Sequence, residues 1–132
     1  MEKQNKRYLN IGCGSTIFPE PWENLDGREM PGVDHISGID KLSFPDNTFD
    51  LVYASHVIEH IKRNDIEQVL KEWVRVLKPG GKLRVATPDF EAAIAVYQKS
   101  GKRIENILGL VVGGQSYEYE CHYLIYDKTS LT

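Results

Sequence analysis

The stretch LSFPDNTFDLVYASHVIEHI, residues 42–61, decides the fold of this chain. It begins with a turn, PDNT, which is followed by the apolar run Phe49–Ala54 that is typical of a buried strand. The run ends in SHVIEH, where two histidines stand four residues apart and a glutamate precedes the second. Ligands of parallel α/β sheets bind beyond the carboxyl ends of the strands. The residues after Ala54 are therefore candidates for a functional site.

Short apolar runs and helical periods alternate on both sides of this stretch. The other predicted strands are residues 7–11, 23–27, 33–37 and 82–87, and HYLIY at 122–126 is strand-like. The clearest predicted helix begins at Asn64 or Asp65 and is stopped by KPGG, with one apolar face made by Ile66, Val69, Leu70, Trp73, Val74 and Leu77. Two further helices are expected, one after Pro88 and Asp89 and one over residues 104–112.

This alternation predicts an α/β fold with a Rossmann-like, doubly wound and mostly parallel sheet in three layers, α/β/α. A length of 132 residues predicts a single domain over residues 1–132. Pro19 and Pro21 exclude a long helix directly after the first strand, because proline interrupts helices.

Composition excludes several classes of function. The net charge of −3 gives no basic footprint for nucleic acid, and we expect no DNA partner. No run of about 18 apolar residues is present, so we expect no membrane insertion. The first ten residues are charged and have no apolar segment of a secretory signal. Cys13 and Cys121 are far apart in the sequence, which favours a reducing cytoplasm over a disulfide framework.

A glycine turn, GCGST, follows the first predicted strand. Gly12 and Gly14 allow a tight turn and a close approach of the backbone to a ligand. Asp26 ends the next strand, where a carboxylate accepts hydrogen bonds from both hydroxyls of a ribose. No P-loop lysine follows, and Ile17 stands where a dinucleotide fingerprint has its third glycine. An adenosine ligand without phosphates fits this pattern better, although a plain loop at the glycines and a turn role for Asp26 remain open.

Four segments in this order, LNIGCGS, NLDG, LSFPDNTFDLVYASHVIEHI and LKEWVRVLKPGGKLRVATPD, resemble a class I S-adenosylmethionine-dependent methyltransferase of the methyltransferase type 11-like family. The resemblance covers roughly residues 7–90 and implies S-adenosylmethionine as the cofactor. It also implies which residues bind the cofactor. The glycine turn would line the methionine and ribose, Asp26 would hold the ribose hydroxyls, the next loop would touch adenine, and the end of the fourth strand would lie beside the sulfur. The residues concerned are Gly12, Cys13, Gly14, Asp26, Ile39, Asp40, Ser55 and His56.

The motif HxxEH at residues 56–60 has a second interpretation, because it is a signature of zinc hydrolases. His56 and His60 would then be zinc ligands with Glu59 as the base, and the third ligand would be His122 or a carboxylate. The position after a buried strand explains the same residues without zinc. We therefore expect no metal, and a zinc hydrolase is the less favoured alternative.

The implied reaction is methyl transfer to a small-molecule or saccharide-type acceptor by in-line displacement. A base is needed only for a hydroxyl or a protonated amine, and the candidates are His56 and His122. Asp89 is a third candidate, but a helix N-cap is favoured there. The fourth strand ends in YASH and lacks the [DNS]PP[YFW] signature of many amino-group methyltransferases. Segment 113–126 could contact the acceptor through Tyr117, Tyr119, Glu120 and His122, or its tyrosines could cover the core.

The sequence stops at Thr132, whereas the family pattern continues through another helix and two strands. We therefore expect a C-terminally truncated fold with an uncovered sheet edge, which would favour a homodimer. The alternative to an active enzyme is a non-catalytic module of the same fold that binds the cofactor or depends on a partner.

Overall fold

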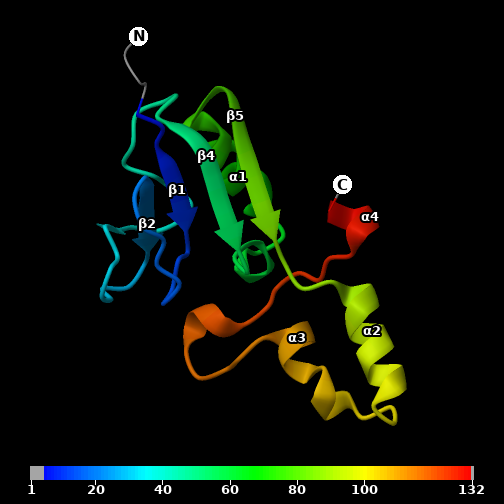
Figure 1. Ribbon diagram of the computed structural model, residues 1–132. Coiled ribbons are helices and arrows are strands. Elements are labelled where there is room, and N and C mark those ends of the chain that lie inside the picture. The colour runs from blue at the N-terminus through cyan, green and yellow to red at the C-terminus, as the bar shows by residue number, and fades with distance from the viewer. Residues whose placement is uncertain (1–4, 132) are drawn as a thin grey trace. The chain divides into compact units, whose positions relative to one another are not determined.

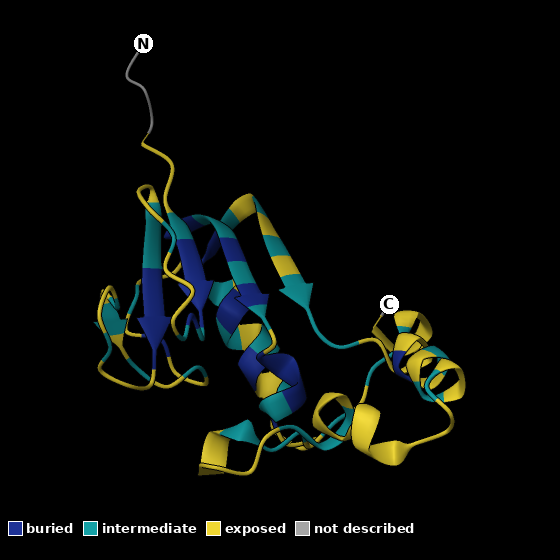
Figure 2. Cartoon of the chain, turned by 60° about the horizontal axis from the view of Figure 1, so that its bottom comes forward, coloured by how far each residue is buried: buried dark blue, intermediate teal, exposed yellow. Residues whose placement is uncertain are grey.

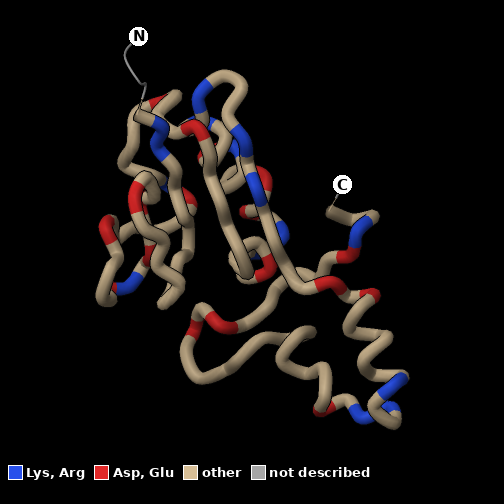
Figure 3. Tube along the Cα trace, viewed as in Figure 1, with Lys and Arg blue, Asp and Glu red and all other residues tan. Residues whose placement is uncertain are grey.

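The computed structural model describes residues 5–131 (Figure 1). The chain divides into two compact units. The first runs up to Ser55 and includes Asp65–Val85, and the second contains His56–Asn64 and the chain from Ala86 onward. No helix within residues 5–131 has the length and apolar character that crossing a membrane requires. Acidic and basic residues are interspersed along the chain (Figure 3).

The first unit is built on a five-stranded sheet in the order β3-β2-β1-β4-β5. β1 pairs in parallel with both β2 and β4, and β2 with β3. The arrows of β4 and β5 also run the same way (Figure 1). The strand order reverses between β1 and β4, as in a doubly wound sheet. The predicted α/β class is confirmed, and the strands are β1 (Tyr8–Ile11), β2 (Trp22–Asp26), β3 (His35–Ile36), β4 (Phe49–Ser55) and β5 (Leu77–Ala86).

The core of this unit lies between the sheet and helix α1 (Ile66–Arg75). Val69 and Trp73 are buried on the apolar face that the sequence predicts, and the buried strand residues are dark in Figure 2. Asp65 is the N-cap residue, but its side chain makes no capping hydrogen bond. The side chains that fill the core from the strands are Leu9, Ile11, Leu25, Phe49, Val52 and Ala54.

Strand β5 begins five residues earlier than the predicted strand 82–87 and includes the KPGG segment. The reason is that pairing starts before the glycines, where the Phe49 N–H donates to the Val76 carbonyl at 2.8 Å. Gly81 then lies close to β4, since a Cβ atom there would meet the Asp50 carbonyl at 3.3 Å. The predicted stop at KPGG is therefore wrong: the helix already ends at Arg75, KPGG lies inside β5, and Leu77, predicted on the helix face, is the first residue of that strand.

The crossover from β1 to β2 contains no helix, as the two prolines predict. Phe18 packs against the sheet, with its ring centroid 5.0 Å from that of Trp22 and 5.7 Å from that of Tyr53. Such tilted aromatic pairs contribute beyond the area they bury. An aromatic cluster thus holds the crossover on the sheet.

The second unit is made of short helices and extended segments. Its helices are α2 (Phe90–Lys99), α3 (Leu108–Val112) and α4 (Lys128–Leu131), with 3₁₀ turns η1 (Ile58–His60), η2 (Ile104–Asn106) and η3 (Glu118–Glu120). The predicted helix over residues 104–112 is broken, because Ile107 has φ −122° and ψ −1°. The predicted strand over residues 122–126 is wrong. That segment takes part in one isolated bridge, Asp89 with Tyr126, and the preceding Cys121 in another with Gly113, so no ladder develops.

Candidate functional site

The glycine turn lies at the carboxyl end of β1 and has the backbone that its sequence predicts. Gly12 has φ 62° and Gly14 has φ 52°, both in the left-handed region that favours glycine. A Cβ atom on Gly14 would meet only the end of the Arg28 side chain, 4.0 Å away. The Cys13 N–H donates to the Leu25 carbonyl at 3.0 Å, which ties the turn to β2. The turn therefore leaves room for a ligand on the side of Gly14.

Asp26 lies at the end of β2 and is brought into contact with the glycine turn. Its Oδ2 accepts a hydrogen bond from the Gly14 N–H at 2.8 Å, and its Oδ1 accepts from N–H and Nε of Arg28, each at 3.0 Å. Burial alone would raise the pKa of this carboxyl. The hydrogen bonds from Arg28 and Gly14 outweigh burial, so the pKa of Asp26 is lowered and the group is ionised at neutral pH.

Two buried asparagines brace the same turn, and the sequence analysis missed them. Asn10 Nδ2 donates to Asn24 Oδ1 at 3.0 Å and to the Thr16 carbonyl at 2.9 Å. Asn24 in turn accepts from the Phe18 N–H and donates to the Phe18 carbonyl. Buried amides are stable only when their hydrogen bonds are made, and here each of them holds loop backbone. Polar residues inside two short apolar strands were the signal that could have revealed them.

The loop after β3 carries Ile39 and Asp40, the residues assigned to adenine. Ile39 is half-buried and its carbonyl accepts a hydrogen bond from Nε1 of the fully buried Trp73 at 2.9 Å, whereas Asp40 is exposed. Farther along the loop, the Leu42 N–H donates to Glu72 Oε1 at 2.7 Å. Helix α1 therefore fixes the loop through polar side chains.

Arg75, in the last turn of α1, also binds the loop after β3 to this helix. Its guanidinium donates to the carbonyls of Leu42 and Phe44 and to the carboxylates of Glu72 and Asp46. The hydrogen bonds to Glu72, and then those to Asp46, raise the pKa of Arg75. Fork-shaped donors suit such a set of oxygens better than a lysine would. The sequence analysis gave no role to Arg75 or Glu72.

The end of β4 carries Ser55 and His56. Ser55 is half-buried. His56 has φ 56°, its side chain is 62% exposed, and its N–H donates to the Ala86 carbonyl at 2.7 Å. A non-glycine residue in the left-handed region is uncommon and is often part of a functional turn. Gly12, Cys13, Gly14, Asp26, Ile39, Asp40 and Ser55 all belong to the first unit, whereas His56 and His122 belong to the second.

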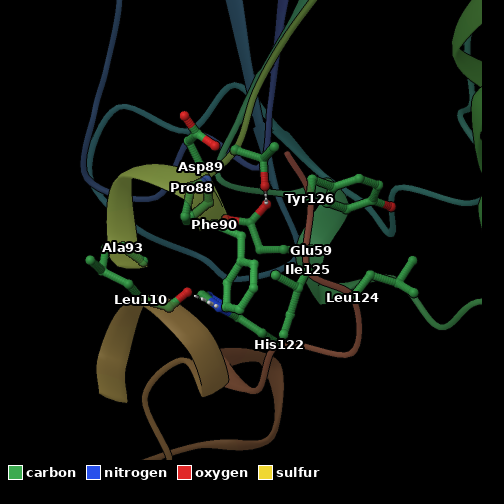
Figure 4. Close-up of a pocket in the computed structure, with 11 residues that line it drawn as sticks. Glu59, Pro88, Asp89, Phe90, Ala93, Leu110, His122, Leu124, Ile125 and Tyr126 are labelled. Carbon is green, nitrogen blue, oxygen red and sulfur yellow. Dashed lines mark hydrogen bonds between the residues drawn. The ribbon is translucent and has the colours of Figure 1, made fainter. Parts of the chain in front are cut away.

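Within the second unit, Glu59 is the centre of a polar cluster (Figure 4). Its side chain is 2% exposed, and Oε2 accepts a hydrogen bond from the Thr87 hydroxyl at 3.0 Å. Ligand atoms of Glu59, His60 and His122 lie within 4.8 Å of one another. His56 Nδ1 is 3.3 Å from Glu59 Oε1, but this contact does not have the geometry of a hydrogen bond. The group of three thus contains His122 instead of His56, unlike the HxxEH interpretation.

The remaining candidates have structural partners. Asp89 is the N-cap of α2, as favoured, and its Oδ1 accepts from the Glu91 N–H at 3.1 Å. Tyr117 and Tyr119 are exposed. Glu120 accepts hydrogen bonds from the backbone and side chain of Ser116. Burial, and then the charge of Glu59, raises the pKa of Tyr126.

The residues at the sheet edge fit an adenosine-containing cofactor. The glycine turn offers open backbone, and Asp26 offers an ionised carboxylate at the end of the neighbouring strand. Each carboxylate oxygen has two acceptor positions. Oδ2 accepts a hydrogen bond from Gly14, and Oδ1 accepts two from Arg28. These contacts hold the carboxylate in one orientation beside the glycine turn, where it could meet the hydroxyls of a ribose.

Comparisons with known proteins find similarity to methyltransferases. Residues 22–85 match the family described as Methyltransferase domain. A demethylmenaquinone methyltransferase of Renibacterium salmoninarum is 43% identical over 98 residues, which cover 61% of this chain and 40% of that protein. A phthiotriol/phenolphthiotriol dimycocerosates methyltransferase of Mycobacterium ulcerans is 33% identical over 107 residues, covering 63% of this chain and 38% of that protein. The chain therefore aligns with less than half of the length of these relatives.

A solved structure supports the fold over nearly the whole chain. The S-adenosylmethionine-dependent methyltransferase of Thermotoga maritima, described as a possible histamine N-methyltransferase, superimposes with a TM-score of 0.66 at 24% identity. The match covers 95% of this chain and 58% of that one. Over residues 22–85 the chain is therefore similar to the Methyltransferase domain family, and it shares its fold with the T. maritima protein. S-adenosylmethionine is the cofactor named in the description of that protein.

Proposed function

We propose that this chain binds S-adenosylmethionine and takes part in methyl transfer to a small-molecule or saccharide-type acceptor by in-line displacement. The observation that carries the proposal is the buried, ionised Asp26 carboxylate hydrogen-bonded to the glycine turn at 2.8 Å. By their names, the relatives from R. salmoninarum and M. ulcerans act on demethylmenaquinone and on phthiotriol-type dimycocerosates. These acceptors are small molecules, which supports that class.

The residues of the first unit bind and orient the cofactor. Asp26 accepts hydrogen bonds from the ribose hydroxyls, and the Gly12–Gly14 backbone lies along the methionine part. Ile39 packs on adenine, and Asp40 beside it is placed to accept a hydrogen bond from the base. Ser55 lines the floor at the end of β4. Because Gly14 and Arg28 already hold the Asp26 carboxylate in position, little side-chain ordering remains for the cofactor to induce.

The cofactor supplies a methyl group on a sulfonium that leaves as a neutral thioether, so no general acid is required. The contribution of the chain is to align the acceptor with that methyl group, and alignment alone lowers barriers by several kcal/mol. For an acceptor hydroxyl, a base must take the proton. His56 is the candidate with an accessible ring, being 62% exposed. His122 is the second candidate, and its Nδ1 already interacts with the Leu110 carbonyl at 3.1 Å.

Calorimetric titration with S-adenosylmethionine and S-adenosylhomocysteine tests this proposal. We expect saturable binding of one equivalent, and Asp26→Ala should weaken it by about 1–3 kcal/mol because charged hydrogen bonds to the ribose are lost. Asp50→Asn is the matched control, because Asp50 is an acidic strand residue paired with Lys78 at 2.8 Å and away from the glycine turn in sequence. Equal affinity of the wild type and Asp26→Ala would remove Asp26 from the site.

Binding without transfer would favour the alternative, a non-catalytic module that binds the cofactor or depends on a partner. β5 is the last strand in the sheet order, and edge strands are templates for pairing with a second copy. We therefore keep a homodimer through this edge as part of the proposal. Sedimentation equilibrium over a range of concentrations tests it, and a monomer throughout would exclude it.

A further inference from the structure

The second unit contains a buried carboxylate that lacks a partner. Glu59 is 1% exposed, and its Oε1 is a buried side-chain atom with no hydrogen-bond partner. An uncompensated buried carboxylate costs several kcal/mol, so such a group is normally paired, protonated or bound to a metal. Two histidine nitrogens lie within 4.0 Å of Oε1, His56 Nδ1 at 3.3 Å and His60 Nε2 at 4.0 Å. Oε1 therefore points into a site where a positive charge would be stabilised.

The two half-buried histidines beside it have their ring orientation set by the backbone. His60 Nδ1 lies 3.1 Å from the Cys121 carbonyl, and His122 Nδ1 lies 3.1 Å from the Leu110 carbonyl. A carbonyl oxygen can only accept, so Nδ1 of each ring must carry the proton. Each neutral ring then has its lone pair on Nε2. Such a second hydrogen bond to a carbonyl is the usual arrangement of a histidine that binds a metal.

We propose that Glu59, His60 and His122 form a binding site for a divalent transition metal of the zinc class. Two imidazoles and one carboxylate are the ligand set of His₂Glu zinc sites, in which water takes the fourth position. The three ligand atoms lie within 4.8 Å of one another. In a tetrahedral site with bonds of about 2.0–2.2 Å they would be about 3.4 Å apart, so the ligand atoms must approach one another by up to about 1.4 Å.

A small cavity lies beside two of the three ligands. Glu59 and His122 line this cavity of about 10 Å³, which is about the space of one water molecule, whereas His60 is not part of its lining. Figure 4 shows this cavity, with the His122 ring held against Leu110. The metal would join η1 to the segment that begins at Cys121, where the Tyr123 N–H already donates to the Glu59 carbonyl at 2.7 Å. The site would thus fasten segment 121–126 within the second unit.

This site differs from the zinc site that the sequence offers. In the less favoured HxxEH interpretation, His56 and His60 are ligands, Glu59 is the base, and the third ligand is His122 or a carboxylate. In the structure Glu59 itself joins His60 and His122, which lies 62 positions beyond His60, and His56 is outside the group. The proposal requires no methyl transfer and no cofactor, so it can be tested on the protein alone.

The test is a titration of tag-free, chelator-treated protein with Zn²⁺ by calorimetry and with Co²⁺ by visible absorption. We expect one equivalent to bind and Co²⁺ to give bands of a four- or five-coordinate site. Glu59→Gln and His122→Asn should weaken binding by more than about 100-fold, because each removes a ligand. His56→Asn should leave the affinity within about threefold if His56 is no ligand.

Controls separate this result from misfolding and from surface binding. His35→Asn is the matched control, because His35 lies in the first unit and pairs with Glu23. Circular dichroism should be unchanged in every variant, and S-adenosylhomocysteine binding should be unchanged in Glu59→Gln and His35→Asn, which also keeps this test independent of the proposed function. Absence of saturable binding, full affinity in His122→Asn, or an equal loss in His35→Asn would each overturn the proposal. Loss in His56→Asn with full affinity in His122→Asn would support the HxxEH site instead.

Discussion

The two units of this chain differ in how completely they bury their apolar side chains. Among the described residues, twelve of the seventeen buried hydrophobic side chains belong to the first unit. Eleven of the fourteen exposed large hydrophobic side chains belong to the second. The first unit is therefore stabilised by a packed core, whereas the second depends more on polar contacts around Glu59. Stability within one chain is often uneven in this way, and functional segments tend to lie in the less stable part.

The largest expected loss of stability comes from truncating the largest core side chain, which belongs to the first unit. Trp73 is fully buried and its Nε1 donates to the Ile39 carbonyl at 2.9 Å. Trp73→Ala should lower the free energy of unfolding by about 3–5 kcal/mol, because it creates a cavity and frees the loop that contains Ile39. Ile94→Ala in the second unit should change it by less than about 1 kcal/mol, since Ile94 is 39% exposed. Urea unfolding measures both, and comparable losses would show that the second unit is equally packed.

Much of the first unit could be predicted from sequence because its signals are local. Alternating strands, the apolar face of α1, the prolines after β1 and the glycine turn each act within about ten residues. The features of this unit that could not be predicted are side-chain hydrogen bonds between residues far apart in the sequence. The bond between Asn10 and Asn24 spans 14 residues, and that between Leu42 and Glu72 spans 30. No periodicity marks such pairs.

The second unit was predicted less well for a physical reason. Its helix over residues 104–112 and its strand over residues 122–126 were inferred from apolar runs, and these runs bury little here. Without a partner strand, HYLIY stays extended but unpaired, and a turn at Ile107 interrupts the helix. The grouping of His122 with Glu59 and His60 also depends on contacts across some 60 residues, which spacing does not reveal.

A substitution at Asp26 should give the next largest loss of stability. Asp26 stabilises the first unit through hydrogen bonds, not through apolar packing. Its folded-state pKa is lowered, so its stabilising contribution is present above the unfolded value of about 3.9 and is lost as the pH falls through the folded value. Asp26→Asn should cost about 1–3 kcal/mol at neutral pH. The difference from the wild type should begin to shrink below about pH 4, where the unfolded carboxyl becomes protonated, and should be lost as the pH falls through the lower folded pKa. Urea unfolding from pH 7 to pH 3 measures it, and a constant difference would contradict the assigned ionisation.

Thr87→Val tests the second unit with the smallest change. It removes the hydroxyl that donates to Glu59 Oε2 at 3.0 Å and should cost about 1 kcal/mol. Amide hydrogen exchange should accelerate at Tyr123 and Leu124, whose N–H groups donate to the Glu59 carbonyl. Thr48→Val is the matched control, since the Thr48 hydroxyl donates to the Pro45 carbonyl at 2.7 Å in the first unit. Faster exchange at Tyr123 in the control would mean that the two units do not open separately.

The placement of the aromatic residues gives the two units separate optical signals. Both tryptophans of the chain, Trp22 and Trp73, belong to the first unit, and Trp73 is fully buried. Five of the seven tyrosines, Tyr97, Tyr117, Tyr119, Tyr123 and Tyr126, belong to the second. Tryptophan emission therefore reports the melting of the sheet, and a tyrosine signal that changes at lower denaturant would reveal a second unit that loosens while the sheet stays intact. Tryptophan and tyrosine fluorescence of the unmodified protein can therefore follow the unfolding of the two units separately.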